Sequence, residues 1–148
     1  MTPNLVGRIQ TRILLLSTIG LLWTFLIVPF LPKGGASIPE TYAVTVLALI
    51  MVAVLGFGWE IIYHLIQQYR WEKDWPTIFG LLVAIPEGVL AWFLLRHGIP
   101  WSVGEVPAST FLSMFISLWL LVWAIANGPL QIFFLRWRYR GGRFTGDW

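Results

Sequence analysis

Hydrophobic residues gather in four long runs along the chain, and most polar residues fall between these runs. The runs cover about residues 13–31, 42–66, 77–95 and 109–135, and each holds about 19 residues or more. A helix rises ~1.5 Å per residue, so each run reaches about 28 Å or further, close to the ~30 Å hydrocarbon core of a bilayer. Backbone groups in lipid must be hydrogen-bonded within their own segment, so each run predicts a transmembrane helix.

The connections between the runs are short, which limits how the helices can pack. Residues 32–41 and 96–108 form two connections rich in Gly and Pro, and residues 67–76 form the third. Short connections place sequential helices side by side and antiparallel. We therefore predict an all-α polytopic membrane protein, in which residues 1–148 form a single domain of four transmembrane helices in an antiparallel bundle, with a short basic tail at 136–148.

The first run stands where a cleaved signal peptide would stand. It is longer than the ~7–15 residue apolar core of such peptides, and no A-x-A cleavage site follows it. We therefore expect it to be a retained helix.

Composition agrees with lipid as the main solvent of the chain. Of the 148 residues, 57% are hydrophobic and 11% are charged, whereas soluble domains have roughly 25% charged residues. Four helices leave no room for a separate soluble domain. Cysteine is absent, which excludes disulfides, thiolate metal sites and cysteine nucleophiles.

The basic residues predict which helix ends face the cytoplasm. Eight of the ten Lys and Arg residues lie on one side of the predicted membrane: Arg8, Arg12, Arg70, Lys73, Arg136, Arg138, Arg140 and Arg143. Lys33 and Arg96 lie on the other side. Because positive residues concentrate in short cytoplasmic connections, we expect both termini and the 67–76 connection in the cytoplasm, with Arg8 and Arg12 just before the first helix.

Two segments carry a resemblance. Residues 59–76 and the Arg-Gly-Gly-Arg sequence at 140–143 resemble segments of uncharacterised bacterial membrane proteins, and this resemblance implies no activity. We expect the chain to lie in the plasma (inner) membrane of a bacterium.

Glu87 lies near the middle of the third predicted helix. A charge there is unfavourable by about 2.5–3.5 kcal/mol on insertion scales, so we expect Glu87 to be protonated at neutral pH unless a cation reaches it. Pro86 has no backbone N–H, so the carbonyl of Leu82 is a free acceptor one turn away. Two interpretations stay open: a relay point for protons or cations, and a neutral carboxyl bonded to another helix.

Glu60, His64, Glu87 and Asn127 form a predicted polar cluster within the membrane. Glu60 and His64 are one turn apart and can share a proton, since His changes charge near neutral pH. Glu60, Glu87 and Asn127 fall at similar depths. The E-x-x-H pairs of carboxylate di-iron bundles are absent, so we expect no metal and no other cofactor. A hydrogen-bond network between helices is favoured over a proton-linked cluster.

Residues 127–129, Asn-Gly-Pro, predict a break in the fourth helix. Pro129 leaves the carbonyl of Ile125 without its helical partner, and Gly128 lets another backbone approach. Broken helices line substrate sites in transporters, but they also occur as simple bends, and we favour the bend.

Every predicted helix also carries a stripe of small or polar residues. The third has Gly80, Ala84 and Gly88 at intervals of four, and the second has Gly56, Glu60 and Tyr63 on one face. Such residues mark helix contacts in membranes, because lipid tails are as apolar as Leu. The stripes are equally compatible with facing one another and with facing a partner protein.

The connection at 67–76 is the densest patch of polar and aromatic residues. Its candidate docking residues are Gln67, Tyr69, Arg70, Trp71 and Trp75. Trp, Tyr and Arg dominate binding hot spots, although the two Trp would also be explained by anchoring at the membrane interface. Mixed charges among so many aromatic residues favour a docking surface.

The basic tail has four arginines beside the membrane: Arg136, Arg138, Arg140 and Arg143. Such clusters attract anionic lipid headgroups by about 1 kcal/mol per residue. Nucleic acid is the other partner of basic patches, but a short tail against a bilayer does not favour it.

No phosphate-binding loop, dinucleotide-binding, zinc-protease or serine-hydrolase motif occurs in the chain, so we do not expect an enzyme. The short connections and helix stripes favour an accessory or assembly subunit of a membrane complex, with other membrane proteins or a second copy as partners. The alternative is an oligomeric proton- or cation-coupled small transporter or channel that uses the intramembrane Glu/His cluster.

Overall fold

The computed structural model describes residues 3–97 and 107–145, and within those ranges the chain is helical, with turns and no strands. Four helical segments are long and apolar enough to cross a membrane: Leu5–Phe30, Ile38–Tyr69, Phe79–His97 and Ala108–Phe133. The all-helical class and the four spans are thus confirmed. Most of the predicted 96–108 connection lies outside the described residues.

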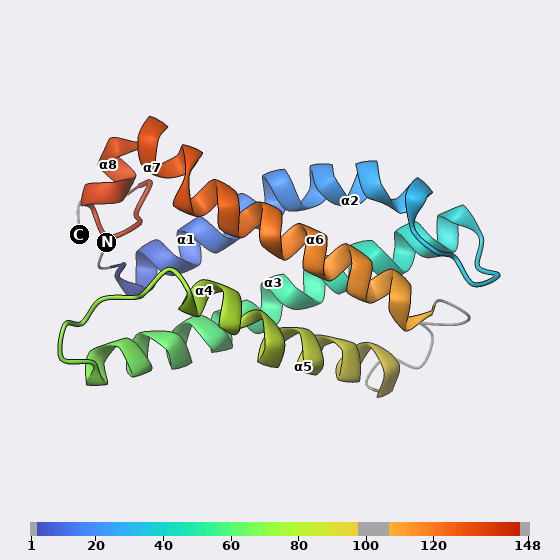
Figure 1. Cartoon of the computed structure of the whole chain (residues 1–148), viewed down its shortest axis with the longest axis horizontal. Coiled ribbons are helices and arrows are strands. Elements are labelled where there is room, and N and C mark those ends of the chain that lie inside the picture. Colours follow the sequence, from blue (N-terminus) through green and yellow to red (C-terminus); the bar gives the residue numbers. More distant parts are fainter. Residues whose placement is uncertain (1–2, 98–106, 146–148) are drawn as a thin grey trace.

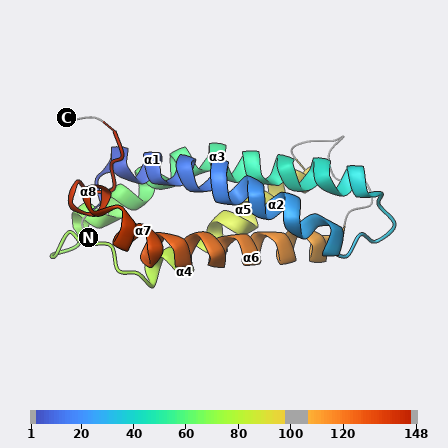
Figure 2. The ribbon, with the colours of Figure 1, turned by 90° about the horizontal axis from the view of Figure 1, so that it is seen from above.

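The four spans lie side by side along the long axis of the molecule (Figures 1 and 2). One end, called the terminal end below, holds the residues near both termini, and there the Asn4 amide donates to the Gly141 carbonyl at 3.0 Å. The connection between the second and third spans lies at the same end. The other end, called the far end, holds the turn at residues 31–37 (Figure 1).

The first span begins eight residues earlier than the predicted start at residue 13. It consists of α1 (Leu5–Leu15), a π-helical turn η1 (Leu16–Gly20), α2 (Leu21–Ile27) and a 3-10 turn η2 (Val28–Phe30). The Asn4 side chain caps α1 by accepting from the Gly7 amide at 2.7 Å. Arg8 and Arg12 therefore lie inside the helix and not before it.

The second span is a single helix, α3 (Ile38–Tyr69), of 32 residues. It begins four residues before the predicted start, because Ser37 and Glu40 form a capping box: the Ser37 amide donates to the Glu40 carboxylate at 2.6 Å, and the Glu40 amide donates to the Ser37 hydroxyl. At ~1.5 Å per residue, α3 is about 48 Å long. Figure 1 shows it extending past the start of the third span at the terminal end.

The third and fourth spans are each interrupted. The third consists of α4 (Phe79–Leu82) and α5 (Ala84–His97), and Pro86 explains the interruption because it cannot donate to the Leu82 carbonyl. The fourth consists of α6 (Ala108–Asn127) and α7 (Pro129–Phe133), followed by a short α8 (Leu135–Tyr139). Gly128, at φ −116° and ψ −98°, separates α6 from α7 at the predicted position.

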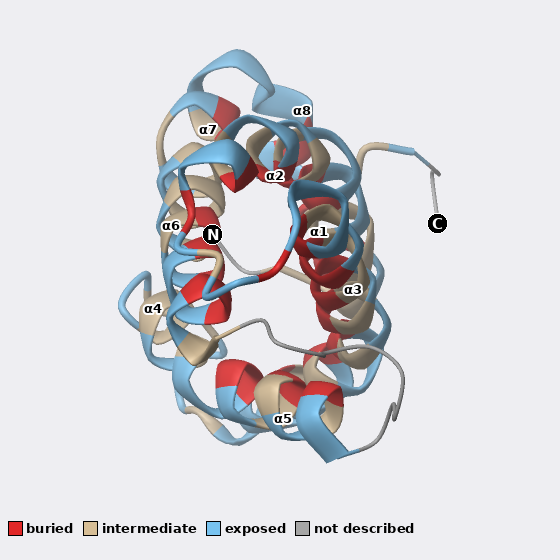
Figure 3. Ribbon diagram, turned by 90° about the vertical axis from the view of Figure 1, so that its right-hand side faces the viewer, coloured by how far each residue is buried: buried red, intermediate tan, exposed pale blue. Residues whose placement is uncertain are grey.

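Buried residues lie on the sides of the helices that face one another, and exposed residues lie on the outside (Figure 3). The main buried cluster comprises Leu16, Val28, Leu31, Ala48, Leu49, Val52, Ala91, Leu95, Phe111, Met114, Phe115 and Leu118. Exposed Phe, Leu, Ile and Val residues on every span provide the surface that lipid would contact.

Three glycines of the predicted stripes face neighbouring helices of the same chain. A Cβ on Gly56 would meet the Arg12 side chain, and a Cβ on Gly88 would lie 2.7 Å from a ring carbon of Phe115. A Cβ on Gly80 would lie 3.1 Å from the Trp123 ring. Of the two arrangements left open by the sequence, these positions adopt the one within the chain.

Candidate functional site: a charged and aromatic cavity

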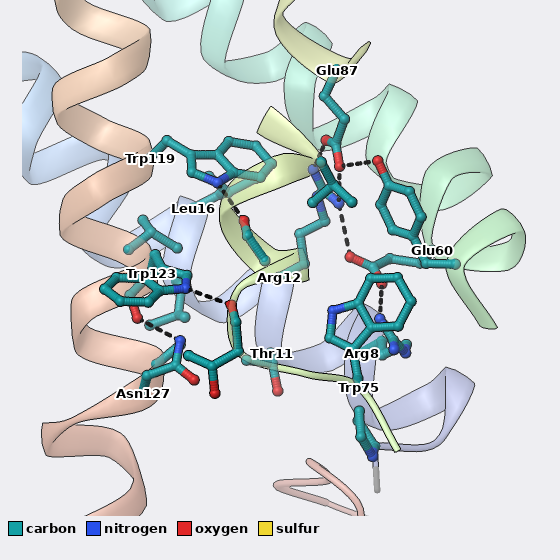
Figure 4. Close-up of a pocket in the computed structure, with 18 of the residues that line it drawn as sticks. Arg8, Thr11, Arg12, Leu16, Glu60, Trp75, Glu87, Trp119, Trp123 and Asn127 are labelled. Atoms are coloured by element: carbon teal, nitrogen blue, oxygen red, sulfur yellow. Dashed lines mark hydrogen bonds and ion pairs between the residues drawn. The ribbon is translucent and has the colours of Figure 1, made fainter. Parts of the chain in front are cut away.

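Arg12 of α1 joins the two carboxylates that the sequence singles out. Its Nη1 donates to Glu60 at 2.8 Å and to Glu87 at 3.3 Å, and its Nη2 donates to the second oxygen of Glu87. Gly56 of α3 makes this approach possible, because any side chain there would overlap Arg12. The guanidinium thus bridges α3 and α5 from a third helix (Figure 4).

Arg8 lies one helical turn before Arg12 and faces the same way. Its Nη1 donates to the other Glu60 oxygen at 3.3 Å, and its Nη2 donates to Gln67 Oε1 at 2.9 Å. Gln67 also donates from Nε2 to the Lys73 carbonyl at 2.7 Å. Gln67, predicted to dock a partner, is instead 2% exposed and fixes the connection to α1.

Tyr63 completes the network. Its hydroxyl donates to Glu87 Oε1 at 2.9 Å, and Glu87 is 2% exposed. Every carboxylate oxygen of Glu60 and Glu87 therefore accepts a hydrogen bond, and two guanidinium groups face two carboxylates. The sequence predicts that Glu87 is neutral unless a cation reaches it, and the structure places Arg12 there as that cation.

Glu60 and Glu87 are brought together, whereas His64 and Asn127 lie outside their network. Both Glu60 oxygens bond to arginine, and His64 Nδ1 is buried without a hydrogen-bond partner. Asn127 donates to the Trp123 carbonyl of its own helix at 2.8 Å. Within the described part of the chain, no group of three or more His, Cys, Asp or Glu is placed to hold a metal.

A cavity of about 340 Å³ lies between this network and α6 (Figure 4). Trp119 and Trp123 of α6 line the wall facing the arginines. Their indole N–H groups donate to the carbonyls of Gly80 at 2.8 Å and Thr77 at 3.0 Å, which fixes both rings against the third span. The indole faces are therefore held in place beside the cavity without spare donors.

The cavity changes character from its inner to its outer part. Leu16, Phe115 and Leu118 line the inner part and belong to the buried apolar cluster. Thr77, Asn127 and Gln131 line the part nearest the terminal end. The arginines and carboxylates lie between these two regions, so the cavity is apolar inside and polar outside.

Trp75 joins the charged wall from the connection. The Arg8 guanidinium lies 4.4 Å from the centre of its ring, within the range of a cation–π contact. The Trp75 ring also packs against Tyr63, with 5.5 Å between the ring centres. Trp75, predicted as a docking residue, is therefore part of the cavity wall.

The C-terminal segment closes over the first helix beside the cavity. Trp137 of α8 donates from Nε1 to the Thr11 hydroxyl at 2.7 Å, and Thr11 donates to the Gly142 carbonyl at 3.0 Å. Gly141 and Gly142 have φ values of 61° and 87°, a left-handed conformation that favours glycine. Trp137 is thereby buried and lines the cavity.

Sequence reasoning missed Arg8, Arg12 and Trp137 as site residues. The arginines precede the apolar run, so they were assigned to the cytoplasmic flank. The available signal was their spacing of four on one helical face, together with two acids on other helices that needed counter-charges.

The remaining docking residues form an exposed tip. Trp71 is 99% exposed and Tyr69 is 91% exposed. Arg70 between them is fixed by hydrogen bonds from Nε at 3.1 Å and Nη2 at 3.0 Å to Asp74. Trp71 and Tyr69 are called the aromatic tip below.

The predicted headgroup-binding arginines lie on and after α8. Arg136, Arg138 and Arg140 are exposed, and Arg143 is partly buried. Arg143 donates from Nε to the Arg140 carbonyl at 3.3 Å. They lie at the terminal end, on the segment that packs on α1 (Figure 1).

Comparison of the chain with protein-family models, curated proteins and solved structures finds no match in any of the three.

Proposed function

We propose that the chain is a non-enzymatic accessory or assembly subunit of a membrane complex, and that it docks a partner membrane protein through the aromatic tip. The observation that carries this proposal is the exposure of Trp71, at 99%, on a short connection at the terminal end. Large aromatic side chains are the commonest anchors of protein interfaces.

The length of α3 supports a protein partner over anchoring in the lipid interface. Its 32 residues span about 48 Å, whereas the hydrocarbon core is about 30 Å thick. Up to about 18 Å of the helix can therefore extend beyond the core. Its first turn carries the charged Glu40, which suits the opposite interface, and part of the excess falls at the end beside Tyr69 and Trp71.

The connection also holds the aromatic tip in a fixed position. Gln67 donates to the Lys73 carbonyl, and Arg70 is paired with Asp74. Lys73 adopts a left-handed conformation, φ 49°, at the turn. Because these bonds order the backbone before a partner binds, less conformational entropy is lost on binding.

The orientation and location proposed from the sequence accompany this function. The four spans would form an antiparallel bundle in the inner membrane of a bacterium, with both termini and the aromatic tip in the cytoplasm. Arg136, Arg138, Arg140 and Arg143 would then contact anionic headgroups of the cytoplasmic leaflet. Nucleic acid is not proposed as a partner.

The alternative, an oligomeric proton- or cation-coupled transporter or channel, has one observation in its favour: the cavity reaches both Glu60 and Glu87. The same two carboxylates are fully paired with Arg8, Arg12 and Tyr63, which leaves no free acid for a cation. The assembly role is therefore preferred. Flux into proteoliposomes that is lost in Glu87→Gln would reverse this preference.

Photo-crosslinking tests the docking role. A benzophenone amino acid at position 71 is expected to give a crosslink of discrete mass to one membrane protein in cells. The same amino acid at Val54, an exposed position in the middle of α3, should give mainly lipid adducts. Trp71→Ala should then lose that partner in a mild-detergent pull-down, while Gln68→Ala, at an exposed neighbour, should keep it.

The absence of cysteine allows a second test with a single thiol. Trp71→Cys should react with a membrane-impermeant maleimide only after cells are opened, whereas Ser37→Cys at the far end should react in intact cells. A Trp71→Cys thiol that reacts only with lipid-soluble reagents would show that the tip is an anchor, and the docking proposal would fail.

A further inference from the structure

We propose that the cavity binds a small acid with an apolar body, whose carboxylate or phosphate is bound by Arg8 near the terminal end. The apolar body would extend inward along Trp123 and Trp119. This binding site is separate from the aromatic tip and does not depend on the docking role.

The arginines of the network have hydrogen-bond donors without a partner, whereas every carboxylate oxygen already has at least one. All carboxylate oxygens of Glu60 and Glu87 accept bonds from Arg8, Arg12 or Tyr63. An arginine offers five N–H donors, but Arg8 uses Nη1 and Nη2 once each and leaves Nε buried without a partner. The Arg8 side chain is only 7% exposed, so few of these donors face open solvent. A ligand that brings acceptor oxygens fits this imbalance.

Arg8 is better placed than Arg12 to bind that ligand. Glu60 lies 2.8 Å from Arg12 and 3.3 Å from Arg8, so it retains its closer partner if Arg8 turns away. Arg12 is held by both carboxylates and packs against Gly56. Arg8 also lies in the first turn of α1, closer to the terminal end, where a negative group loses less hydration than it would deeper in the membrane.

The rest of the cavity suits an apolar body. The indole N–H groups of Trp119 and Trp123 are used by the third span, so their ring faces offer apolar contact only. Leu16, Phe115 and Leu118 continue this surface inward. The volume of about 340 Å³ is large enough for one short chain or ring system.

Ligand protection of a single thiol tests the proposal on the full chain in nanodiscs of zwitterionic phospholipid. Asn127→Cys places the reporter at the outer part of the cavity, and the rate of its reaction with a water-soluble maleimide is measured. Decanoate or 1-naphthoate is expected to slow the reaction about tenfold or more, and decanol or decyltrimethylammonium about twofold or less. Protection by decanoate alone supports a lipid-derived acid, and protection by 1-naphthoate supports a water-soluble aromatic acid. Stronger protection by the ammonium compound, or equal protection by all four, overturns the proposal.

Two variants, each with a matched control, test whether Arg8 and Trp123 form the proposed binding site. Arg8→Gln should remove most of the protection by the acid, while Arg96→Gln, which removes an exposed arginine outside the cavity, should leave it unchanged. Trp123→Leu should weaken protection while Trp92→Leu, also outside the cavity, should not. If Arg8→Gln does not fold, Trp123→Leu decides alone, and full protection in that variant contradicts the proposed site.

Discussion

The two halves of the molecule satisfy their buried polar groups in different ways. In the far half, buried threonines form neutral hydrogen bonds: Thr24 donates to Gly20 and Thr45 to Thr41 of their own spans, each at 2.8 Å, and Thr110 donates to the Pro32 carbonyl. In the terminal half, buried polar atoms are paired between helices, and most of the partners are charged. Neutral bonds, within and between spans, therefore satisfy the far half, whereas charged groups link α1, α3 and α5 in the terminal half.

The comparison indicates which half carries a function. A buried ion pair is weak support for stability, because apolar residues of similar volume often replace it without loss. The far half shows that this chain can close a bundle with apolar side chains and neutral hydrogen bonds. The charged network therefore has a better explanation in the cavity beside it than in the packing of the bundle.

The largest expected effect is that of Arg12→Met in the terminal half. The change leaves the buried Glu87 without its cation, and breaking a buried ion pair costs about 3–5 kcal/mol. We expect the free energy of unfolding, measured in mixed micelles with increasing SDS, to fall by that amount. Arg96→Met removes only an exposed cation–π contact with Trp92 and should change it by at most about 1 kcal/mol.

A combined variant shows whether the loss comes from unpaired charge. Adding Glu87→Gln to Arg12→Met removes the uncompensated carboxylate, while Glu60 remains paired with Arg8, and should recover most of the lost stability. If the combined variant is no more stable than Arg12→Met, the arginine acts through packing, and the electrostatic contrast between the halves is incorrect.

The second-largest expected effect comes from the hydrogen bonds of two tyrosines, one in each half. Tyr63 donates to the charged Glu87 and Tyr42 donates to the Phe25 carbonyl, both at 2.9 Å. Hydrogen bonds to charged groups contribute about 1.5–3 kcal/mol and those between neutral groups about 0.5–1.5 kcal/mol. Tyr63→Phe should therefore lower the unfolding free energy more than Tyr42→Phe does. Equal losses of unfolding free energy in the two variants would show that the hydrogen bond to Glu87 stabilises the chain no more than the neutral bond does.

Two glycines beside the charged network, one in a close helix contact and one in open space, test the packing of the terminal half. A Cβ on Gly88 would lie 2.7 Å from Phe115, whereas a Cβ on Gly58 would meet nothing within 4 Å. Overpacking costs about 1–3 kcal/mol, so Gly88→Ala should destabilise the chain. Gly58→Ala should be neutral or stabilising by up to about 1 kcal/mol, because Ala is the better helix former. Thermal unfolding of the two variants in one detergent measures the difference.

The hydropathy pattern predicted the four spans because it depends on the length of each apolar run. It predicts that the first span starts at residue 13 instead of Leu5, because the polar residues before 13 lower the hydropathy of that segment. Arg8 and Arg12 enter the helix because they find Glu60 and Glu87 on α3 and α5. Such long-range pairing does not appear in the hydropathy of a single run.

The sequence predicts only part of the candidate site, because it does not show which distant residues come into contact. Glu60 and Glu87 were singled out because a charge within the membrane is unfavourable, and that argument uses one residue at a time. His64 was joined to Glu60 because it is one turn away, but the arginines are stronger partners and occupy the carboxylate. Trp75 was assigned to a docking surface because the sequence does not show that the connection folds back onto Arg8.

The smallest expected effect belongs to Thr24→Val in the far half, and it is the most direct check of the contrast. Thr24 is fully buried, and its hydroxyl bonds within α2 and the turn before it. Valine keeps the shape, and the Gly20 carbonyl loses only the hydroxyl bond, so the unfolding free energy should fall by at most about 1 kcal/mol. A loss comparable to that of Arg12→Met would mean that the far half is coupled between helices as tightly as the terminal half. The charged network would then not be the feature that distinguishes the terminal half from the far half.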